Sequence, residues 1–475
     1  MKSEIKFGTD GWRAVMCDTF TFANVRITIQ AIADYLANHG MTGMGALVGY
    51  DSRFLSERFA REAAEVLAAN GVRTLVTARD TPTPTVAFTV SKRKLAGAVM
   101  FTASHNPPEY NGVKWIPYYA GPADPEITSE IERNVASAVQ NKSEPRRTPY
   151  EEACSAGLIE EIDPAPDYIS RLRGLVDLPA IKAAGVRVVY DAMYATGRGY
   201  VDRILKDAGC DVEVIHGRRD PLFGGGGPDP VEARLGELRQ CVLETGADLG
   251  IATDGDADRF GVIDSDGTYI SANQVISLLL VHLIKNRRRW GKVVRTIATT
   301  HLIDRIARAN GLDALETPVG FKYICQAMRE SDVVIGGEES GGLSIGGHIP
   351  EKDGILANLL LAEFRAMSGK TLGEALRETM EEYGPSHTRR IDIHLPNDAR
   401  KGQIMQAFEG SPPAEFAGVR VQSVSTLDGV KVVLSNGDWF LIRPSGTEPV
   451  VRVYGESGTV QGLERLLSDV QNLIG

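Results

Sequence analysis

Cysteine is scarce in this chain. Among 475 residues there are five, at positions 17, 154, 210, 241 and 325, and no two have CxxC spacing. An odd and scattered set is typical of free thiols in a reducing compartment, not of a disulfide framework. We therefore expect no structural disulfides.

Long apolar runs are also missing. The longest, VISLLLVHLI (275–284), is about half the length of a membrane span, so it predicts a buried helix. The start, MKSEIKFGTDGWRAV, has no apolar core of the kind that a signal peptide needs. We expect a cytoplasmic protein with no membrane partner.

An excess of positive charge is absent, because 62 acidic residues outnumber 52 Lys and Arg and give a net charge of −10. This balance argues against nucleic acid or an anionic membrane as a partner. An anionic ligand would need locally gathered Lys and Arg. The composition, 43% hydrophobic and 24% charged, is that of a globular protein, and the length suggests about three or four domains.

A pattern of strands recurs three times along the chain. First runs at 45–53, 186–197 and 292–304 are followed by second runs at 72–85, 211–230 and 312–324, and then by third runs at 97–107, 247–259 and 332–342. Helical stretches such as SERFAREAAEVLAANG (56–71) separate them. Alternating strands and helices predict parallel α/β sheets, so we expect three similar α/β domains in preference to one large sheet.

The tail from about residue 385 has a different pattern. Strand-like runs follow one another with tight turns at LDGV and SNGD, and a last helix (459–473) places Leu463, Leu466, Leu467, Val470 and Leu473 on one face. We expect a smaller C-terminal α+β domain. The predicted domain limits are 1–150, 151–259, 260–375 and 376–475. The last boundary falls in a helical region near 370–380 and is the least sharply defined.

Each third run ends in a dense polar loop, where ligands bind in open parallel sheets. In TDGDADR, alternation puts Asp254, Asp256 and Asp258 on one side, where only a cation relieves their repulsion. Oxygen ligands of this kind suit Mg²⁺. An EF-hand is disfavoured because its positions 6 and 12 are Arg259 and Ser265. A solvated loop is the alternative.

Two further loops carry polar groups without a specific chemistry of their own. In GGEESGG, Glu338 and Ser340 are suited to grip sugar hydroxyls, although on this signal alone a glycine-rich turn is the favoured interpretation. RPSGTEP offers a guanidinium, hydroxyls and backbone N–H groups that suit a phosphate, or an ordinary hairpin turn. Arg13, Lys114, Lys322 and Lys352 stand near these loops and could together line a polyanion site.

Ser104 lies in FTASHNPPEY (101–110), directly after a strand-like run. It is a candidate nucleophile, a helix cap or an ordinary turn residue. The chain has no G-x-S-x-G in this loop, so an esterase is not supported. A serine that faces a metal-binding Asp cluster can instead carry a phosphoryl group, which would supply a further oxygen to Mg²⁺.

Together the motifs FGTDGWR, TASHNP, DGDADR, GEESGG and RPSGTEP, in this order along the whole chain, resemble the α-D-phosphohexomutase family. The resemblance implies four domains around a central cleft, with Ser104 as a phosphoserine that binds Mg²⁺ together with the three aspartates. It implies that Arg13, His105, Lys114 and Arg259 lie near the reacting phosphoryl group. Lys352 in EKDG matches an acid/base candidate.

The resemblance also implies the substrate contacts. Glu338 and Ser340 would grip the sugar, together with the TPVGFKYI segment, and a phosphate loop would hold the non-reacting phosphate. In the TPVGFKYI segment the implied contacts are Thr317, Gly320 and Lys322. In the phosphate loop they are Arg443, Ser445, Gly446 and Thr447. Ligands would be hexose phosphates, with glucose 1,6-bisphosphate as intermediate and activator. A monomer and a homodimer both stay open.

The implied reaction passes the phosphoryl group of Ser104 to a hexose phosphate and takes the other one back. TPVGFKYI with GEESGG and HIPEKDG looks most like the phosphoglucomutase branch. Dual-specificity relatives tend to have a His where this chain has Gly342, so that role is unfilled or passes to His348 or Lys352. A phosphomannomutase, a hexose 1,6-bisphosphate synthase and a Mg²⁺-dependent sugar phosphatase are the alternatives.

Overall fold

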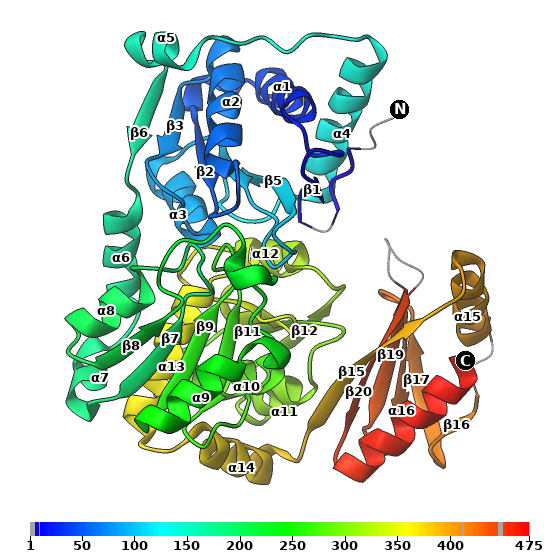
Figure 1. Ribbon diagram of the computed structural model, residues 1–475. Coiled ribbons are helices and arrows are strands. Elements are labelled where there is room, and N and C mark those ends of the chain that lie inside the picture. Colours follow the sequence, from blue (N-terminus) through cyan, green and yellow to red (C-terminus); the bar gives the residue numbers. More distant parts are fainter. Residues whose placement is uncertain (1–4, 9, 411–412, 445–449, 475) are drawn as a thin grey trace. The chain divides into compact units, whose positions relative to one another are not determined.

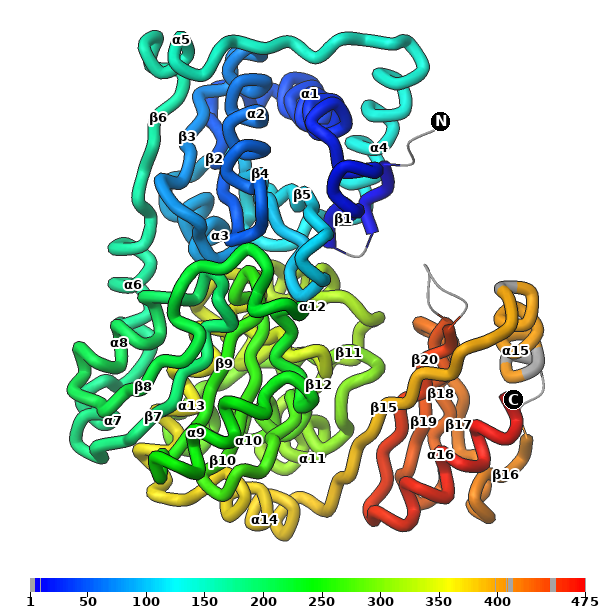
Figure 2. The backbone as a smooth tube through the Cα atoms, viewed as in Figure 1, coloured from blue at the N-terminus to red at the C-terminus, as the bar shows by residue number. Residues whose placement is uncertain are grey.

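The computed structural model describes residues 5–8, 10–410, 413–444 and 450–474. The chain forms two units, which are described one at a time. The first contains Met1–Ser271 and Ser340–Leu372, and the second contains Ala272–Glu339 and Gly373–Gly475. Figures 1 and 2 follow the chain through its elements.

The first unit begins with a six-stranded sheet of order β1-β5-β4-β2-β3-β6. Its strands are β1 (Trp12–Val15), β2 (Ala46–Tyr50), β3 (Thr74–Thr77), β4 (Gly97–Phe101), β5 (Tyr110–Pro117) and β6 (Ile159–Ile162). One hydrophobic core joins it to the helices α1 (Phe22–Asn38), α2 (Ser56–Ala69), α4 (Pro125–Gln140) and α5 (Tyr150–Ser155). Helix α3 (Thr83–Arg93) packs in a second core with Leu47, which lies on the opposite face from Ala46 and Val48. Strands β2 and β4 are therefore apolar on both faces.

A second sheet of the first unit has the order β10-β9-β7-β8. Its strands are β7 (Arg187–Asp191), β8 (Asp211–Ile215), β9 (Leu249–Thr253) and β10 (Phe260–Asp264). The helices of this part of the chain are α6 (Ala165–Arg173), α7 (Leu178–Ala184), α8 (Val201–Asp207), α9 (Gly236–Thr245) and α13 (Gly354–Ser368), with β14 (Gly342–Ile345) before α13. Helix α9 packs on β7 and β9, and α13 packs on β9 and β10. Short 3-10 turns lie at Thr42–Met44, Phe223–Gly225 and Glu232–Arg234.

The second unit contains a parallel sheet of order β12-β11-β13. Its strands are β11 (Lys292–Thr296), β12 (Ala314–Thr317) and β13 (Val333–Glu338), and its helices are α10 (Ala272–Lys285), α11 (Leu302–Ala309), α12 (Phe321–Glu330) and α14 (Leu372–Tyr383). The apolar run 275–284 lies within α10 and is largely buried, as predicted. None of the described helices is long and apolar enough to span a bilayer.

The C-terminal sheet is antiparallel with the order β15-β20-β19-β18-β17-β16. Its strands are β15 (His387–His394), β16 (Glu415–Phe416), β17 (Val419–Ser425), β18 (Val430–Leu434), β19 (Trp439–Pro444) and β20 (Val450–Ser457). Helices α15 (Asp398–Gly410) and α16 (Val460–Ile474) cover one face. On the other face Trp439 and Leu441 pack against Ile297 and Ala298, which follow β11.

The three-fold repeat is confirmed by strand order. In each of the three α/β sheets, the strand of the first run lies between the strands of the second and third runs. The strand orders are β3-β2-β4, β8-β7-β9 and β12-β11-β13. Both predicted hairpin turns join neighbouring antiparallel strands, β17 to β18 and β18 to β19. The predicted fold class, three α/β domains and a smaller C-terminal α+β domain, is confirmed, while the exact domain limits stay predictions.

One predicted core position is wrong. Leu473 in α16 is 49% exposed, and Ile474 is buried in its place. The helix has about 3.6 residues per turn, so the spacing from Leu463 through Leu467 and Val470 continues to Ile474 on the same face.

Candidate active site

Ser104 lies just after β4 in a strained backbone conformation. Its φ is +50°, a left-handed value that residues other than glycine seldom adopt, and only 1% of it is exposed. Its N–H donates to Thr102 Oγ1 at 2.8 Å. Such strain persists where the surroundings impose it, and it concentrates at functional sites. The local fold therefore holds the hydroxyl in one direction.

The surroundings that impose this conformation centre on Arg53, just after β2. Its guanidinium is fully buried and is paired with the equally buried Asp51 at 3.0 Å. Its two Nη groups donate to four carbonyl oxygens of the serine loop, those of Ser104, Asn106, Pro107 and Tyr110, at 2.6–3.0 Å. The rigid guanidinium group, with its five N–H donors, thus holds the whole loop in place.

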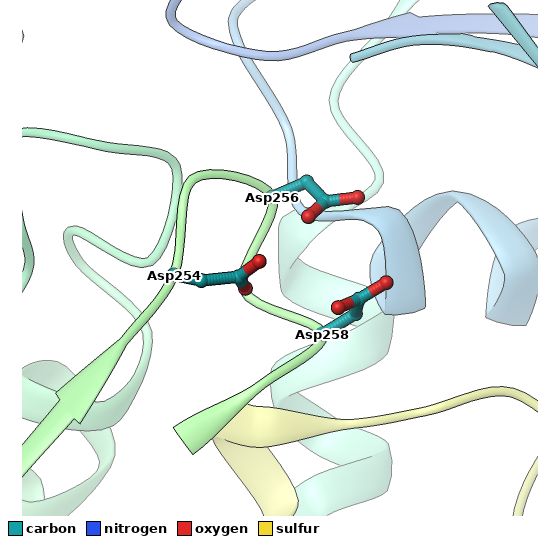
Figure 3. A group of neighbouring side chains, drawn as sticks. All are labelled: Asp254, Asp256 and Asp258. Atoms are coloured by element: carbon teal, nitrogen blue, oxygen red, sulfur yellow. The ribbon is translucent and has the colours of Figure 1, made fainter. Parts of the chain in front are cut away.

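The three aspartates of TDGDADR follow β9 and are buried, with exposures of 0–1%. Figure 3 shows their side chains converging from one short loop. One ligand oxygen of each lies within 4.8 Å of those of the others. The alternation of Asp254, Asp256 and Asp258 along the loop thus turns three carboxylates toward a common point.

Ser104 and the aspartate loop meet directly. Ser104 Oγ donates to Asp254 Oδ2 at 2.8 Å. The loops also touch through their backbones, because a Cβ on Gly255 would lie 2.4 Å from the carbonyl oxygen of Ser104. Only glycine permits this approach. On the other side, Thr83 at the start of α3 binds Asp256 through its N–H at 2.9 Å and its Oγ1 at 2.6 Å.

Two buried lysines stand in the same cluster. Lys114 Nζ lies 2.9 Å from Asp256 Oδ2 and 3.1 Å from Asp258 Oδ2, and Lys352 Nζ lies 3.1 Å from the same oxygen of Asp258. Both also contact Asp10 Oδ2, at 2.9 and 3.0 Å. Burial disfavours their charge, but the carboxylates outweigh it and raise the pKa of both lysines. They are ammonium groups suited to neutralising phosphate.

The donor set fits a metal ion. Asp256 Oδ1 and Asp258 Oδ1 are buried and have no hydrogen-bond partner among the described residues. Burial and the neighbouring carboxylates of Asp256 and Asp258 also raise the pKa of Asp254 well above its usual range. Unpaired buried carboxylate oxygens are costly, and a divalent cation removes that cost. Carboxylate oxygens are the ligands that Mg²⁺ prefers.

Arg13 and His105 complete the surroundings of the serine. Arg13 Nη1 donates to Asn106 Oδ1 at 2.9 Å, and His105 Nδ1 lies 3.4 Å from Ser104 Oγ. Burial, aided by Arg259 and Arg13, lowers the pKa of His105 to about 2, so its imidazole is neutral. Arg259 joins the same loop through its N–H, which donates to Asp254 Oδ1 at 3.0 Å.

His348 has a structural role. Its Nε2 lies 2.8 Å from Asp353 Oδ2, which also accepts a 2.6 Å hydrogen bond from Tyr168. Asp353 in turn caps α13 through Leu356 N at 2.9 Å. The ring is fully buried within this arrangement, which anchors the start of α13.

Of the other predicted contacts, Thr317, Gly320, Lys322 and Glu338 belong to the second unit and Ser340 belongs to the first. Thr317 ends β12, Gly320 precedes α12 with a φ of +127° that favours glycine, and Lys322 Nζ lies 5.3 Å from the centre of the Tyr323 ring. Glu338 ends β13 with 7% exposure, and Ser340 follows in the next turn. The structure thus places these residues at the ends of strands or the start of a helix.

The phosphate loop is described only at its beginning. Arg443 lies near the end of β19, and its Nε donates to Asp428 Oδ2 at 3.0 Å. The remaining three predicted members, Ser445, Gly446 and Thr447, lie outside the described residues.

Several residues of this site escaped prediction. Asp10 belongs to the motif FGTDGWR, in which only Arg13 was predicted to belong to the site. Arg53 follows the first strand in YDSRF, and a polar group at a strand end was the available signal. Glu351 precedes Lys352, is 1% exposed, and has a pKa that burial raises to about 8. Nothing in the local sequence distinguishes it from a surface glutamate.

The buried serine hydroxyl faces carboxylates that are suited to a metal, with ammonium groups beside them, and this geometry suits the transfer of phosphoryl groups. Family models named phosphoglucomutase/phosphomannomutase match the chain four times, with alpha/beta/alpha domain I at residues 4–142, domain II at 166–267, domain III at 271–383 and the C-terminal domain at 400–473.

Individual relatives agree with these matches. A phosphoglucomutase of Komagataeibacter xylinus is 31% identical, over 95% of this chain and 87% of its own length. A phosphoglucomutase/phosphomannomutase of Thermococcus kodakarensis is 30% identical, over 95% and 94%. A crystal structure described as a candidate phosphomannomutase from Thermus thermophilus superimposes with a TM-score of 0.85 at 33% identity, covering 99% of each chain.

The chain belongs to the α-D-phosphohexomutase family. Members of this family are isomerases that act by phosphotransfer, and phosphohexomutase activity is supported for this chain. The names of the relatives differ in the hexose, since phosphoglucomutases, phosphomannomutases and phosphoglucosamine mutases all occur among them.

Proposed function

We propose that this protein interconverts glucose 1-phosphate and glucose 6-phosphate through a phosphoserine at Ser104 and a 1,6-bisphosphate intermediate. The observation that carries the proposal is the 2.8 Å contact between Ser104 Oγ and Asp254 Oδ2, inside a buried triad. The serine of an esterase triad donates to a histidine, whereas Ser104 donates to a carboxylate that is suited to a metal. These are the surroundings that a phosphorylated oxygen needs.

In the first transfer the bond between phosphorus and Ser104 Oγ breaks and a bond to the free hydroxyl of the hexose phosphate forms. The hydroxyl proton passes to a base of the site, for which the neutral imidazole of His105 is the candidate. Lys352 carries its own proton in this structure, so it is the candidate for the acid that returns a proton in the second transfer. In the second transfer the bond between the other phosphorus and its sugar oxygen breaks, that oxygen takes up a proton from an acid of the site, and the phosphorus forms a bond to Ser104 Oγ. The product is the isomeric monophosphate, and the enzyme is phosphorylated again.

This reaction asks mainly for positioning and charge neutralisation. Lys114, Lys352, Arg13 and Arg259 supply cationic or N–H groups around the transferred group. Asp254, Asp256 and Asp258 would hold Mg²⁺ together with the phosphoserine. When bound, Mg²⁺ would draw charge from the phosphoryl oxygens.

Substrate recognition is assigned to three further loops. Glu338 and Ser340 would accept and donate hydrogen bonds to the sugar hydroxyls. Arg443, with the remaining members of RPSGTEP, would hold the phosphate that does not react. The TPVGFKYI segment would add Lys322 to that phosphate or to the sugar. The ligands are hexose phosphates, and glucose 1,6-bisphosphate acts as intermediate and activator.

Glucose is favoured by the TPVGFKYI, GEESGG and HIPEKDG segments and by the phosphoglucomutase of Komagataeibacter xylinus among the relatives. Mannose is the second candidate, because the Thermus thermophilus structure with 33% identity is described as a candidate phosphomannomutase. A carboxylate that grips neighbouring hydroxyls tolerates one inverted centre, so dual specificity is compatible with the same site.

The test is an assay of the purified protein with glucose 1-phosphate, mannose 1-phosphate and glucosamine 1-phosphate, each with and without the corresponding 1,6-bisphosphate. The proposal expects the highest kcat/KM with glucose 1-phosphate and a stimulation by bisphosphate. A higher value for mannose or glucosamine phosphate would reassign the sugar. Release of inorganic phosphate without glucose 6-phosphate would indicate a phosphatase, and accumulation of free bisphosphate would indicate a bisphosphate synthase.

A further inference from the structure

Asp428 lies in the turn between β17 and β18 and joins two loops that are far apart in the sequence. Its Oδ2 accepts hydrogen bonds from Arg443 Nε at 3.0 Å and from Val319 N at 2.9 Å. Arg443 begins the candidate phosphate loop, and Val319 belongs to the TPVGFKYI segment. One carboxylate oxygen therefore contacts both candidate substrate loops of the second unit.

The backbone fixes the position of this carboxylate. Gly429, the next residue, has a φ of +91°, and a Cβ there would lie 2.4 Å from the carbonyl oxygen of Ile442. The turn therefore packs directly on β19, one residue before Arg443. The register of β18 on β19, with Val430 opposite Ile442, holds it there.

The contact also decides which edge of the guanidinium is engaged. Asp428 takes the Nε–H, and among the described residues the two Nη groups on the other edges of the planar fork have no hydrogen-bond partner. These groups can bind two oxygens of one phosphate at the same time. The side chains of Arg443 and Asp428 are 20% and 24% exposed, so the pair is accessible to a ligand without being fully solvated.

The loop on the other side of Asp428 is anchored as well. Val319 packs with Trp439 and Leu441 of the C-terminal sheet. Lys431 on β18 donates to Glu316 Oε2 in β12 at 2.6 Å and to the carbonyl oxygen of Ile297 at 2.9 Å. The end of β12 and the hairpin that carries Asp428 are thus held together by packing and by buried polar contacts.

We propose that Asp428 is a positioning residue of the reaction, which aims Arg443 at the non-reacting phosphate and couples its position to the Thr317–Lys322 segment. This inference rests on the proposed function of Arg443. A purely structural role is the competing explanation. A partly exposed ion pair contributes little stability, so the two explanations differ in what they predict for substrate binding.

The first variant is Asp428→Asn, which keeps the size and one carbonyl acceptor for Val319 N but removes the charge. The inference expects KM for glucose 1-phosphate to rise about tenfold, because hydrogen bonds to charged groups contribute on the scale of a tenfold affinity change. It expects kcat to change by less than about threefold, because a misaimed phosphate ligand acts on substrate binding.

Asp438→Asn is the matched control. Asp438 lies in the next hairpin turn, between β18 and β19, where it accepts from Ser457 Oγ at 2.9 Å and from Gly458 N at 3.1 Å. It has no contact with Arg443 among the described residues. The control should have the wild-type KM. An equal rise of KM in both variants would overturn the inference, since any weakening of the hairpins would then suffice.

A double-mutant cycle with Arg443→Ala closes the test. If Asp428 acts through Arg443, Asp428→Asn has no further effect on KM in the Arg443→Ala background, and additive effects would overturn the inference. If Arg443→Ala alone leaves KM unchanged, the phosphate-binding assignment of Arg443 fails. If Arg443→Ala raises KM while Asp428→Asn does not, only the positioning role fails.

If Asp428→Asn does not fold, Asp428→Ser takes its place in both experiments, and the same outcomes apply.

Discussion

Ser104 Oγ lies 2.8 Å from Asp254 Oδ2, although 150 residues separate the two in the sequence. The contact is made because β4 and β9 are the third strands of two repeated sheets, and each ends in a polar loop. Gly255 allows the two loops to touch, and Arg53 holds the serine loop in its strained form. The relationship between this hydroxyl and this carboxylate is the basis for the chemistry proposed above.

Ser104→Ala should abolish mutase activity, on the order of 10⁴-fold or more, because it removes the oxygen that carries the phosphoryl group in the proposed reaction. The fold should survive, since the substitution removes one hydroxyl whose main partner is Asp254. A coupled assay and a thermal melt check both points. Ser91→Ala, at an exposed position of α3, is the control with unchanged activity. Full activity of Ser104→Ala would contradict the phosphoserine mechanism.

Mg²⁺ should raise the melting temperature of the wild-type protein, and chelation should lower it again. A bound cation relieves the repulsion among Asp254, Asp256 and Asp258 and binds only the folded chain. Asp258→Asn should lose most of this shift, whereas Asp266→Asn, in an exposed turn, should keep it. The measurement is a melt at a series of Mg²⁺ concentrations without substrate. Equal shifts in the two variants would place the cation elsewhere.

Arg53→Lys should reduce both stability and activity. Lysine cannot reach four carbonyl oxygens, and it leaves buried acceptors without donors, at a cost of about 3 kcal/mol in the free energy of unfolding. Urea unfolding measures this cost, and the kcat of the folded fraction measures the effect on the serine loop. Arg58→Lys, at an exposed position in the first turn of α2, is the comparison. A wild-type kcat in Arg53→Lys would show that the guanidinium does not position the loop.

Lys431 should make the free energy of unfolding depend on pH in the alkaline range. Burial, together with the charge of Arg295, lowers its pKa to about 8, and Glu316 and Asp304 oppose the shift only in part. The unfolded chain then binds more protons than the folded chain between about pH 8 and pH 10.5, so the contribution of this group to stability rises with pH across that window. His301 also lies next to Glu316, the carboxylate that contacts Lys431.

Across the whole window this effect amounts to about 3 kcal/mol, because a side chain that is 2% exposed is little screened and each pKa unit corresponds to about 1.4 kcal/mol. Urea unfolding of wild type and Lys431→Met at pH 7.5 and 9.5 measures the larger part of it. The gain in stability between the two pH values should be larger in the wild type. Parallel behaviour of both proteins would show that Lys431 keeps its ordinary pKa.

Much of the architecture was predictable because it follows from local patterns. The repeated runs before Ser104, Asp254 and Glu338 are short apolar runs of the length of buried strands, and a polar loop at the end of a parallel strand marks a site. The predicted stripe in α16 failed at Leu473 because one residue shifts a side chain by about 100° around the helix, and Ile474 continues the buried stripe.

The supporting residues of the site were not predictable in the same way. Arg53 and Asp428 have ordinary local surroundings in the sequence, YDSRF and LDGV. Their roles come from partners that are distant along the chain, such as Tyr110 for Arg53 and Val319 for Asp428. A single sequence does not contain these pairings, since they depend on which strands become neighbours.

The most direct test of the central claim is a single-turnover experiment with protein that carries one labelled phosphoryl group. The phosphorylated protein is mixed with glucose 1-phosphate, quenched at intervals, and examined by intact mass and by the label in the sugar. We expect that the label leaves Ser104 and appears in glucose 1,6-bisphosphate at least as fast as kcat. Label that stays on the protein during turnover, or that appears only as inorganic phosphate, would contradict it.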